Sequence, residues 1–477
     1  MKTIQKHRKI IGYLTVVLSL ILTYVALSST GGLKFNLGGG GDDYSYMIPI
    51  FDDFRHYLGG HRTLGYPLFL HSYFKLFNTY ETLPHFCFIF FAAAIIYLYS
   101  NLNLFFDSEW SSLLVCLGLI YGGFSFSYHL VTTESIVSGV LVFVFAATLN
   151  LIRKPSIGSI ITLSVVIFLA WNIRPSLIVL ILVVPLSIVF SIFIGRTRIS
   201  RRILLFLAFG LLAPLVIFIT VRYVLVGHVG ITSFTAFGLS SHATTLLTAE
   251  DIDNLSITRR TTAERILKNK ESIFDECQAF HASKRRFERT IACANEMGMI
   301  SWLVVIEETK GVTPIPQLGA ISNPWVFTDY LPLGSLTYFF TTHHDPMVEE
   351  RLMGYAKEVL RIKYLEYVKW IFTAFLDFVK KVISDLFVVI ALGAFLAHFY
   401  KRSYIDRSLV HRSLVNMTII AAFSFLFYSA SYLLTVFIYV PLPRYNQVSE
   451  LYWNAFILVS PFYFALLARF GFEFRDK

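Results

Sequence analysis

Long runs of apolar residues, separated by short polar stretches, make up most of this chain. The first run, residues 10–28, follows a basic segment and is long enough to cross a lipid bilayer as a helix, because about 20 apolar residues span the hydrocarbon core. Later runs have the same character, and one long polar region interrupts them. The pattern predicts ten membrane-crossing helices, near residues 10–28, 83–100, 109–128, 131–150, 157–173, 176–195, 202–224, 382–400, 413–438 and 449–470.

The polar region, residues 225–380, holds 16 Lys and Arg against 18 Asp and Glu and is too long to be a simple connector. Apolar residues recur at helical spacing over 261–309, which predicts helices there. A further predicted helix over 346–381 mixes aromatics with Lys and Glu, a composition typical of a helix at the membrane surface. The chain therefore divides into three predicted parts: an N-terminal transmembrane module of seven helices (1–224), a soluble, mainly helical region (225–380) and a C-terminal transmembrane module of three helices (381–477).

Composition supports an all-α polytopic membrane protein, since 55% of the residues are hydrophobic and the mean hydropathy is +0.62. The net charge of +10 arises largely in the termini and in the short loops near Arg153 and Arg201, which indicates that these segments are cytoplasmic. Topology therefore explains the charge without a nucleic-acid partner. Residues 29–81 and 225–380 fall on the opposite, extracytoplasmic side. A cleaved signal peptide ending near Ala26 is an alternative reading of the first run and would leave the later topology unchanged.

The chain has four cysteines. Cys87 and Cys116 lie in apolar runs and are expected to be packing residues. Cys277 and Cys293 lie in the extracytoplasmic region, where a disulfide between them is an open alternative to two free thiols. No Cys and His spacing typical of a metal site occurs in the sequence.

The richest concentration of polar chemistry lies in the first extracytoplasmic loop, residues 29–81. A connector between two membrane helices needs no such groups, and four consecutive glycines there allow close approach of the backbone. The loop's aspartates, histidines and arginines are Asp42, Asp43, Asp52, Asp53, His56, His61, His71, Arg55 and Arg62. We interpret Asp52 and Asp53 mainly as a solvated helix face, and the histidines as structural or surface residues.

Other polar residues recur at predicted helix ends on the same side of the membrane: His129, Glu134, Arg174 and Arg444. Ionisable residues at membrane depth indicate function by default. The structural alternatives are a buried polar pair for Glu134, snorkelling or a helix-end contact for Arg174, and an interfacial anchor for Arg444. Together these groups could support group transfer from a phosphate, because a carboxylate can take a proton from an acceptor hydroxyl while Arg stabilises the departing phosphate.

Four short motifs resemble one known family. These are the acidic pair in GDDYSY after the first helix, the RTLGYPLFL run, a Thr-Glu at the head of the fourth helix and an Arg-Tyr before the last helix. In this order and on this side, they resemble the GT-C membrane glycosyltransferases, in particular the group of protein O-mannosyltransferases and the aminoarabinose transferases of lipid A. The resemblance extends to the layout of the whole chain.

The resemblance implies an inverting glycosyltransferase that moves a sugar from a polyprenyl-phosphate donor to an extracytoplasmic glycan, lipid or protein, in a bacterial inner membrane. It implies that Asp42 is the general base, with Asp43 beside it as the second catalytic carboxylate. The substrate-binding residues that we expect from the motifs and from the polar helix ends are Tyr46, Arg62, Tyr66, Glu134, Arg174, Arg444 and Tyr445. A lysine found in some relatives next to the prolines of the turn has no counterpart here, since Gly65 is the nearest residue.

We assign no cofactor, although the carboxylates of Asp42, Asp43 and Glu134 could hold a divalent metal. Two other classes stay open. A polysaccharide polymerase or ligase also places arginines on a large exterior loop, but the acidic pair after the first helix argues against it. A transporter or lipid flippase often has repeated halves and broken helices, and neither is evident in this sequence. The sequence names neither the sugar nor the acceptor.

Overall fold

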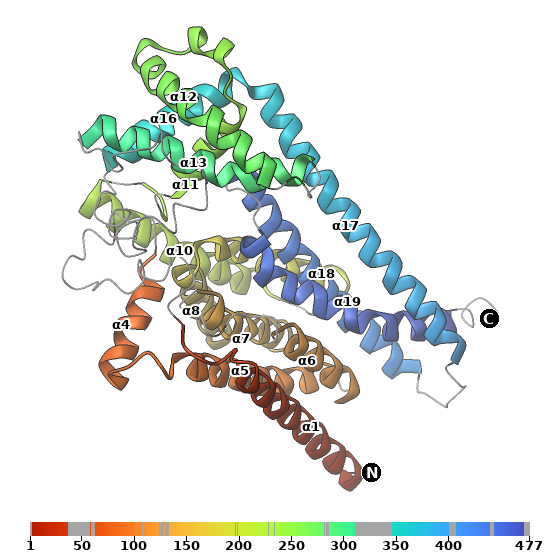
Figure 1. The fold of residues 1–477 in the computed structure, drawn as a ribbon. Coiled ribbons are helices and arrows are strands. Elements are labelled where there is room, and N and C mark those ends of the chain that lie inside the picture. Colours follow the sequence, from red (N-terminus) through yellow and green to blue (C-terminus); the bar gives the residue numbers. More distant parts are fainter. Residues whose placement is uncertain are drawn as a thin grey trace.

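The computed structural model of this chain is helical, with a bundle of long helices and a second group of helices beyond one end of it (Figure 1). Within the described part of the chain there is no β-strand, so the all-α class is confirmed. The structure describes residues 2–36, 58, 63–106, 109–123, 128, 133–195, 197, 199–227, 229–232, 234–280, 282, 286–310, 346–399, 407–438 and 443–471.

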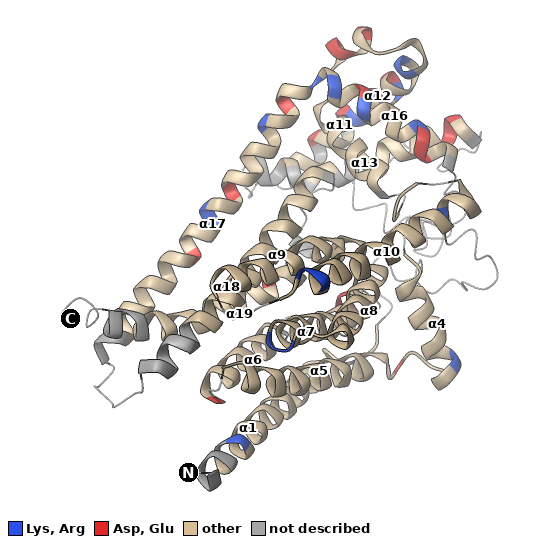
Figure 2. Ribbon diagram, turned by 180° about the vertical axis from the view of Figure 1, so that it is seen from behind, with Lys and Arg blue, Asp and Glu red and all other residues tan. Residues whose placement is uncertain are grey.

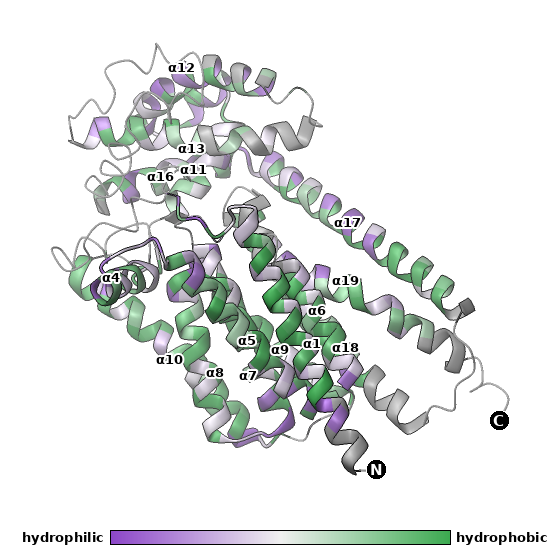
Figure 3. Cartoon of the chain, turned by 60° about the horizontal axis from the view of Figure 1, so that its bottom comes forward, coloured by the Kyte–Doolittle hydropathy of each residue, from purple (hydrophilic) through white to green (hydrophobic). Residues whose placement is uncertain are grey.

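Among the residues that the structure describes, six stretches of helix are long and apolar enough to cross a membrane: Lys9–Ser29, Leu83–Phe106, Thr133–Arg153, Pro175–Phe193, Arg201–Val226 and Val415–Phe437. Two shorter apolar helices, Glu109–Gly122 and Ile157–Ile173, accompany them. The bundle is therefore that of a multi-pass membrane protein, and Figure 3 shows hydrophobic residues along most of its length. Its elements are α1 (Lys2–Ser29), α5 (Leu83–Phe106), α6 (Glu109–Gly123), α7 (Thr133–Arg153), α8 (Ile157–Ile173), the 3-10 helix η1 (Pro175–Val179), α9 (Leu180–Phe193), α10 (Arg201–Val226), α18 (Arg407–Ile438) and α19 (Pro443–Gly471).

Helix α7 occupies the centre of the bundle, and 89% of the residues in its most apolar stretch are buried. A helix that is apolar on all sides needs apolar surroundings, which neighbouring helices supply around most of α7. Small residues let those neighbours approach: a Cβ added at Gly139 would lie 3.3 Å from the backbone of Phe91 on α5. Close backbone approach at small residues is the usual way in which helices associate in lipid.

In the described part of the chain, five helices lie outside the bundle proper. They are α4 (Gly65–Phe77), α11 (Phe234–Leu246), α12 (Ile257–Phe280), α13 (Arg286–Lys310) and α16 (Pro346–Ile362), with the short 3-10 helix η2 (Ala249–Asn254) between α11 and α12. Helices α11, α12, α13 and α16 share an apolar core of their own, in which Trp302, Leu303 and Tyr355 are buried. Charged residues are frequent on α12, α13 and α16, absent from α11 and sparse along the bundle (Figure 2). We call this group the α11–α16 region, and the end of the bundle that faces it the outer end.

The prediction of one helix over 346–381 is wrong in its extent. The chain breaks at Lys363, between α16 and α17 (Tyr364–Phe399), and α17 then runs for 36 residues without interruption. At the break, α16 packs its apolar face onto α11 and α13, and Lys363 Nζ lies 3.0 Å from Asp251 Oδ1 of η2. The boundary predicted at residue 380 consequently falls inside α17.

Polar contacts fasten α17 to the last helix. Lys381 Nζ lies 2.8 Å from Glu450 Oε1 of α19, and Trp453 Nε1 donates to Asp385 Oδ2 at 2.7 Å. Between these contacts, Phe378 and Val382 pack with Tyr428 and Trp453 in a small apolar cluster. None of these residues was predicted to lie in a site.

Candidate functional site

Helices α8 and α10 run side by side in the same direction and end together at the outer end. Trp171 near the end of α8 contacts Phe218 of α10 edge-on, with ring centroids 5.2 Å apart. Earlier along both helices, a Cβ at Gly210 would lie 2.5 Å from Ser164 Oγ. The residues that follow α8 therefore lie beside the last turns of α10, which lead into the α11–α16 region.

Arg174 lies at the break between α8 and η1. Its backbone is extended (φ −136°, ψ 108°), and Pro175 follows it. A residue before proline is disfavoured in the helical conformation, and proline itself is well suited to begin a helix, so the sequence Arg-Pro ends α8 and starts η1. The break leaves the Arg174 side chain at the outer end.

Glu134 lies in the first turn of α7, directly opposite Arg174. Arg174 Nη1 is 2.6 Å from Glu134 Oε1, and it also donates to Thr133 Oγ1 at 3.3 Å. Arg174 Nε donates to Ser176 Oγ at 3.3 Å. A carboxylate at a helix N-terminus is itself favoured by the helix dipole, so α7 supports the charge that holds Arg174.

This ion pair is buried, with side-chain exposures of 7% for Arg174 and 17% for Glu134. Removing a guanidinium from water is costly unless a partner charge and hydrogen bonds compensate for the loss. The pair matches the structural alternative raised for Glu134, a buried polar pair. The low exposure of Arg174 does not fit a side chain that snorkels to water.

Helix α4 brings a third predicted segment to the same place. It begins at Gly65, whose backbone lies so close to Asn172 that an added Cβ would meet the Asn172 carbonyl carbon and oxygen at 2.7 Å. Tyr66 follows, fully buried, with its ring stacked on Phe69 at 6.0 Å. Tyr66, Glu134 and Arg174, predicted from three separate motifs, thus come from elements that meet at the outer end.

The first loop is anchored on both sides of residues 37–57, the segment that contains Asp42, Asp43 and Tyr46. Before them, Leu33 is buried and Phe35 stacks on Tyr80 with centroids 6.1 Å apart. After them, the Leu58 carbonyl accepts a hydrogen bond from Arg222 Nε, and Thr63 is buried just before α4. The segment between these anchors therefore begins and ends at the outer end of the bundle.

Several predicted site residues lie outside the described residues. They are Asp42, Asp43, Tyr46 and Arg62 in the first loop. Arg444 and Tyr445 belong to the first turn of α19, but their side chains also lie outside what the structure describes. Their roles stay predictions.

The structure joins Cys277 on α12 to Cys293 on α13 by a disulfide, with Cα atoms 5.8 Å apart. Cys87 and Cys116 are buried and unbonded, in keeping with packing roles. Within the described ranges, no three His, Cys, Asp or Glu side chains gather as metal ligands do. The carboxylates of Asp42 and Asp43, two of the three proposed for a divalent metal, fall outside those ranges.

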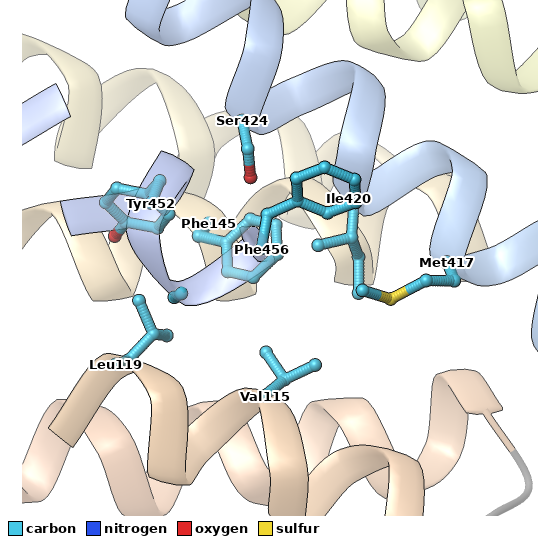
Figure 4. Close-up of a pocket in the computed structure, with 9 residues that line it drawn as sticks. Val115, Leu119, Phe145, Met417, Ile420, Ser424, Tyr452 and Phe456 are labelled. Carbon is cyan, nitrogen blue, oxygen red and sulfur yellow. The ribbon is translucent and has the colours of Figure 1, made fainter. Parts of the chain in front are cut away.

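A small pocket between α6, α7, α18 and α19 does not suit a sugar (Figure 4). Its volume of about 10 Å³ is room for about one water molecule. The lining is mostly apolar, with the Ser424 hydroxyl directed toward it. We do not assign this pocket to the candidate site.

Sequence reasoning missed Arg222, which is buried at the outer end of α10 and bonds to the first loop. The available signal was a single basic residue, four positions before the end of a long apolar run. That signal alone does not separate a buried anchor from an interfacial arginine.

We find no match between this chain and any protein-family model, curated protein or solved structure.

Proposed function

We propose that this protein is a GT-C type inverting glycosyltransferase, which moves a sugar from a polyprenyl-phosphate donor to a glycan, lipid or protein. In this proposal the chain crosses a bacterial inner membrane ten times, with both termini in the cytoplasm. The outer end of the bundle and the α11–α16 region are then extracytoplasmic. The α11–α16 region would contribute to the choice of acceptor.

The observation that carries the proposal is the buried Arg174–Glu134 pair at the outer end, with its 2.6 Å contact. It lies where α4, α7 and α8 meet, and the first loop begins and ends at the same side. A cation held rigidly at the polar end of a membrane bundle is suited to a phosphate that reaches it from the lipid. This arrangement supports a reaction in which a lipid phosphate departs.

The proposed reaction is a single displacement. The acceptor oxygen attacks the anomeric carbon while Asp42 takes the proton of the acceptor hydroxyl. The bond between that carbon and the phosphate oxygen breaks, and its electron pair stays on the polyprenyl phosphate. Arg62, Arg174 and Arg444 are the candidates to stabilise the developing negative charge.

In this scheme Glu134 acts on Arg174 rather than on the sugar. Its carboxylate orients the guanidinium, because the short contact and the Thr133 hydroxyl together restrict the side chain. A positioned cation loses less entropy when the charged transition state forms. Tyr46, Tyr66 and Tyr445 complete the proposed substrate-binding set, and Asp43 stands beside the base.

Sugar transfer by membranes that contain the protein tests the proposal. Wild type and the Asp42→Asn and Asp43→Asn variants each receive radiolabelled polyprenyl-phosphate sugars and a crude acceptor extract. We expect Asp42→Asn alone to abolish transfer while the protein still inserts and folds. Loss in Asp43→Asn alone would keep the class and reassign the base.

A wild-type protein that transfers sugar from no donor of a broad panel would refute the proposal. Accessibility labelling then separates the remaining classes. The key charges of a transporter or lipid flippase should react from both sides of the membrane in turn, and those of a polysaccharide polymerase or ligase from the outer side only.

A further inference from the structure

Arg222 is an unusual residue for its helix. Helix α10 lies at the edge of the bundle, and only 11% of the residues in its most apolar stretch are buried. Its buried side chains are Leu207, Leu211 and, in the last turns, Arg222, which is only 1% exposed. The most buried side chain of an otherwise peripheral helix is therefore a charged one.

The guanidinium of Arg222 joins segments that are far apart in sequence. Nε donates to the Leu58 carbonyl in the first loop, and Nη1 donates to the Gly230 carbonyl at 3.0 Å, in the link from α10 to α11. Glu349, buried in the first turn of α16, lies close enough for its charge to attract the guanidinium. One side chain thus bonds to the first loop and to the link that leads into the α11–α16 region, and it is attracted by the charge of Glu349 in that region.

A buried arginine is a costly way to fill space, because a guanidinium loses its hydration on burial. An apolar side chain of similar length would pack at this position without that cost, but it could not bond to two carbonyls. Arginine can, since its planar group carries five donors in a fixed geometry. The contacts that distinguish Arg222 from an apolar residue are those that fix the loop at Leu58.

We propose that Arg222 is a positioning residue, which holds the first loop in register with the α11–α16 region. Leu58 lies in the part of the first loop that leads into α4, four residues before Arg62. Fixing its carbonyl therefore fixes the point from which the chain enters α4, whose first residue, Gly65, lies against Asn172 beside the Arg174–Glu134 pair. The catalytic part of this inference rests on the proposed function, whereas the anchoring part does not.

The test uses the full-length protein in nanodiscs with a single reporter thiol, Thr63→Cys, at a side chain of the first loop that is only 2% exposed. The native thiols Cys87 and Cys116 are buried, and Cys277 is bonded to Cys293. Maleimide labelling rates are compared for the reporter alone, with Arg222→Met and with Arg222→Lys. The matched control is Arg260→Met, because Arg260 also donates to backbone carbonyls, of Leu255 and Asp253, but inside the α11–α16 region.

We expect Arg222→Met to raise the labelling rate about tenfold, since loss of a charge-assisted hydrogen bond raises the population of the open loop. Arg222→Lys should restore part of the protection, and Arg260→Met should leave the rate unchanged. Should Arg222→Met fail to fold, Glu349→Gln, which weakens the hold on the guanidinium without removing it, should raise the rate by a smaller factor. Equal rates in all folded variants would overturn the proposal.

Kinetics of sugar transfer give the second readout. Arg222→Met should lower kcat while KM for the acceptor stays near the wild-type value, because the acceptor would still bind a folded α11–α16 region. With kcat expressed per folded protein, a general loss of folding would lower the amount of active protein and leave both constants unchanged. If the wild type transfers no sugar, the proposed function fails, while the labelling experiment still decides whether Arg222 anchors the loop.

Discussion

Gly65 lies directly against Asn172, with so little space that a Cβ at position 65 would be 2.7 Å from the Asn172 carbonyl oxygen. Asn172 is itself buried, two residues before Arg174. The contact therefore sets the distance between the start of α4 and the candidate site. No side chain larger than hydrogen fits there without a shift of backbone.

Gly65→Ala should destabilise the protein by about 1 to 3 kcal/mol, the usual cost of overpacking, despite the better helix propensity of alanine. Thermal unfolding in detergent measures the change. Gly158→Ala is the matched control, because nothing lies within 4 Å of a Cβ at Gly158 near the start of α8. Equal stability of the two variants would contradict the close contact.

The Arg174–Glu134 pair should behave as one unit when either partner is removed. Glu134→Gln and Arg174→Met should each lower stability by about 3 kcal/mol, since each leaves a buried charge without its partner. The double variant should lose clearly less than the sum of the two single losses. A double-mutant cycle by thermal unfolding provides the measurement, and strictly additive losses would show that the two charges do not interact.

Features of this molecule that depend on local sequence could be predicted, whereas features that depend on contacts between distant residues could not. Apolar runs long enough to cross lipid identify α1, α5, α7 and α10 from local composition alone. The pairing of Arg174 with Glu134 depends on how α7 and α8 pack, so the sequence could only mark both residues as polar groups at helix ends on the same side. The split at Lys363 was not predictable, because the contact with Asp251 that accompanies it comes from a residue far away in sequence.

The Cys277–Cys293 disulfide should stabilise the α11–α16 region. Closing a loop with a sequence separation of 16 residues is worth about 3 kcal/mol through the lost entropy of the unfolded chain. A reducing agent should therefore lower the unfolding temperature of the wild type. The Cys277→Ser, Cys293→Ser double variant should already unfold at the lower temperature and should not respond further. A response of that variant to the reducing agent would assign the effect to another cause.

Stability of the α11–α16 region should also fall in acid through Asp251. Burial alone would raise the pKa of this carboxyl, but hydrogen bonds from Thr248 and Lys363 outweigh that effect and hold the pKa below its ordinary value of 3.8. Folding therefore favours the ionised form, so the stabilisation is present above the ordinary pKa and is lost as the pH falls through the lower, folded value. Unfolding followed between pH 6 and the acid limit should show this loss.

Asp251→Asn should remove that part of the pH dependence. Asp253→Asn is a suitable comparison, since the side chain of Asp253 is 94% exposed and lies 4.0 Å from Arg260. We expect the acid profile of Asp253→Asn to follow the wild type. A wild-type profile in Asp251→Asn would mean that other carboxyl groups cause the acid loss.

Helix α17 has a mechanical consequence. At 1.5 Å per residue, its 36 residues form a rod about 54 Å long, roughly 24 Å more than a hydrocarbon core of about 30 Å. The rod begins at the α11–α16 region, and its contacts with α19 through Lys381 and Asp385 fix it to the bundle. In the proposed topology the surplus length acts as a spacer of set height, which holds the α11–α16 region at a fixed elevation above the membrane surface.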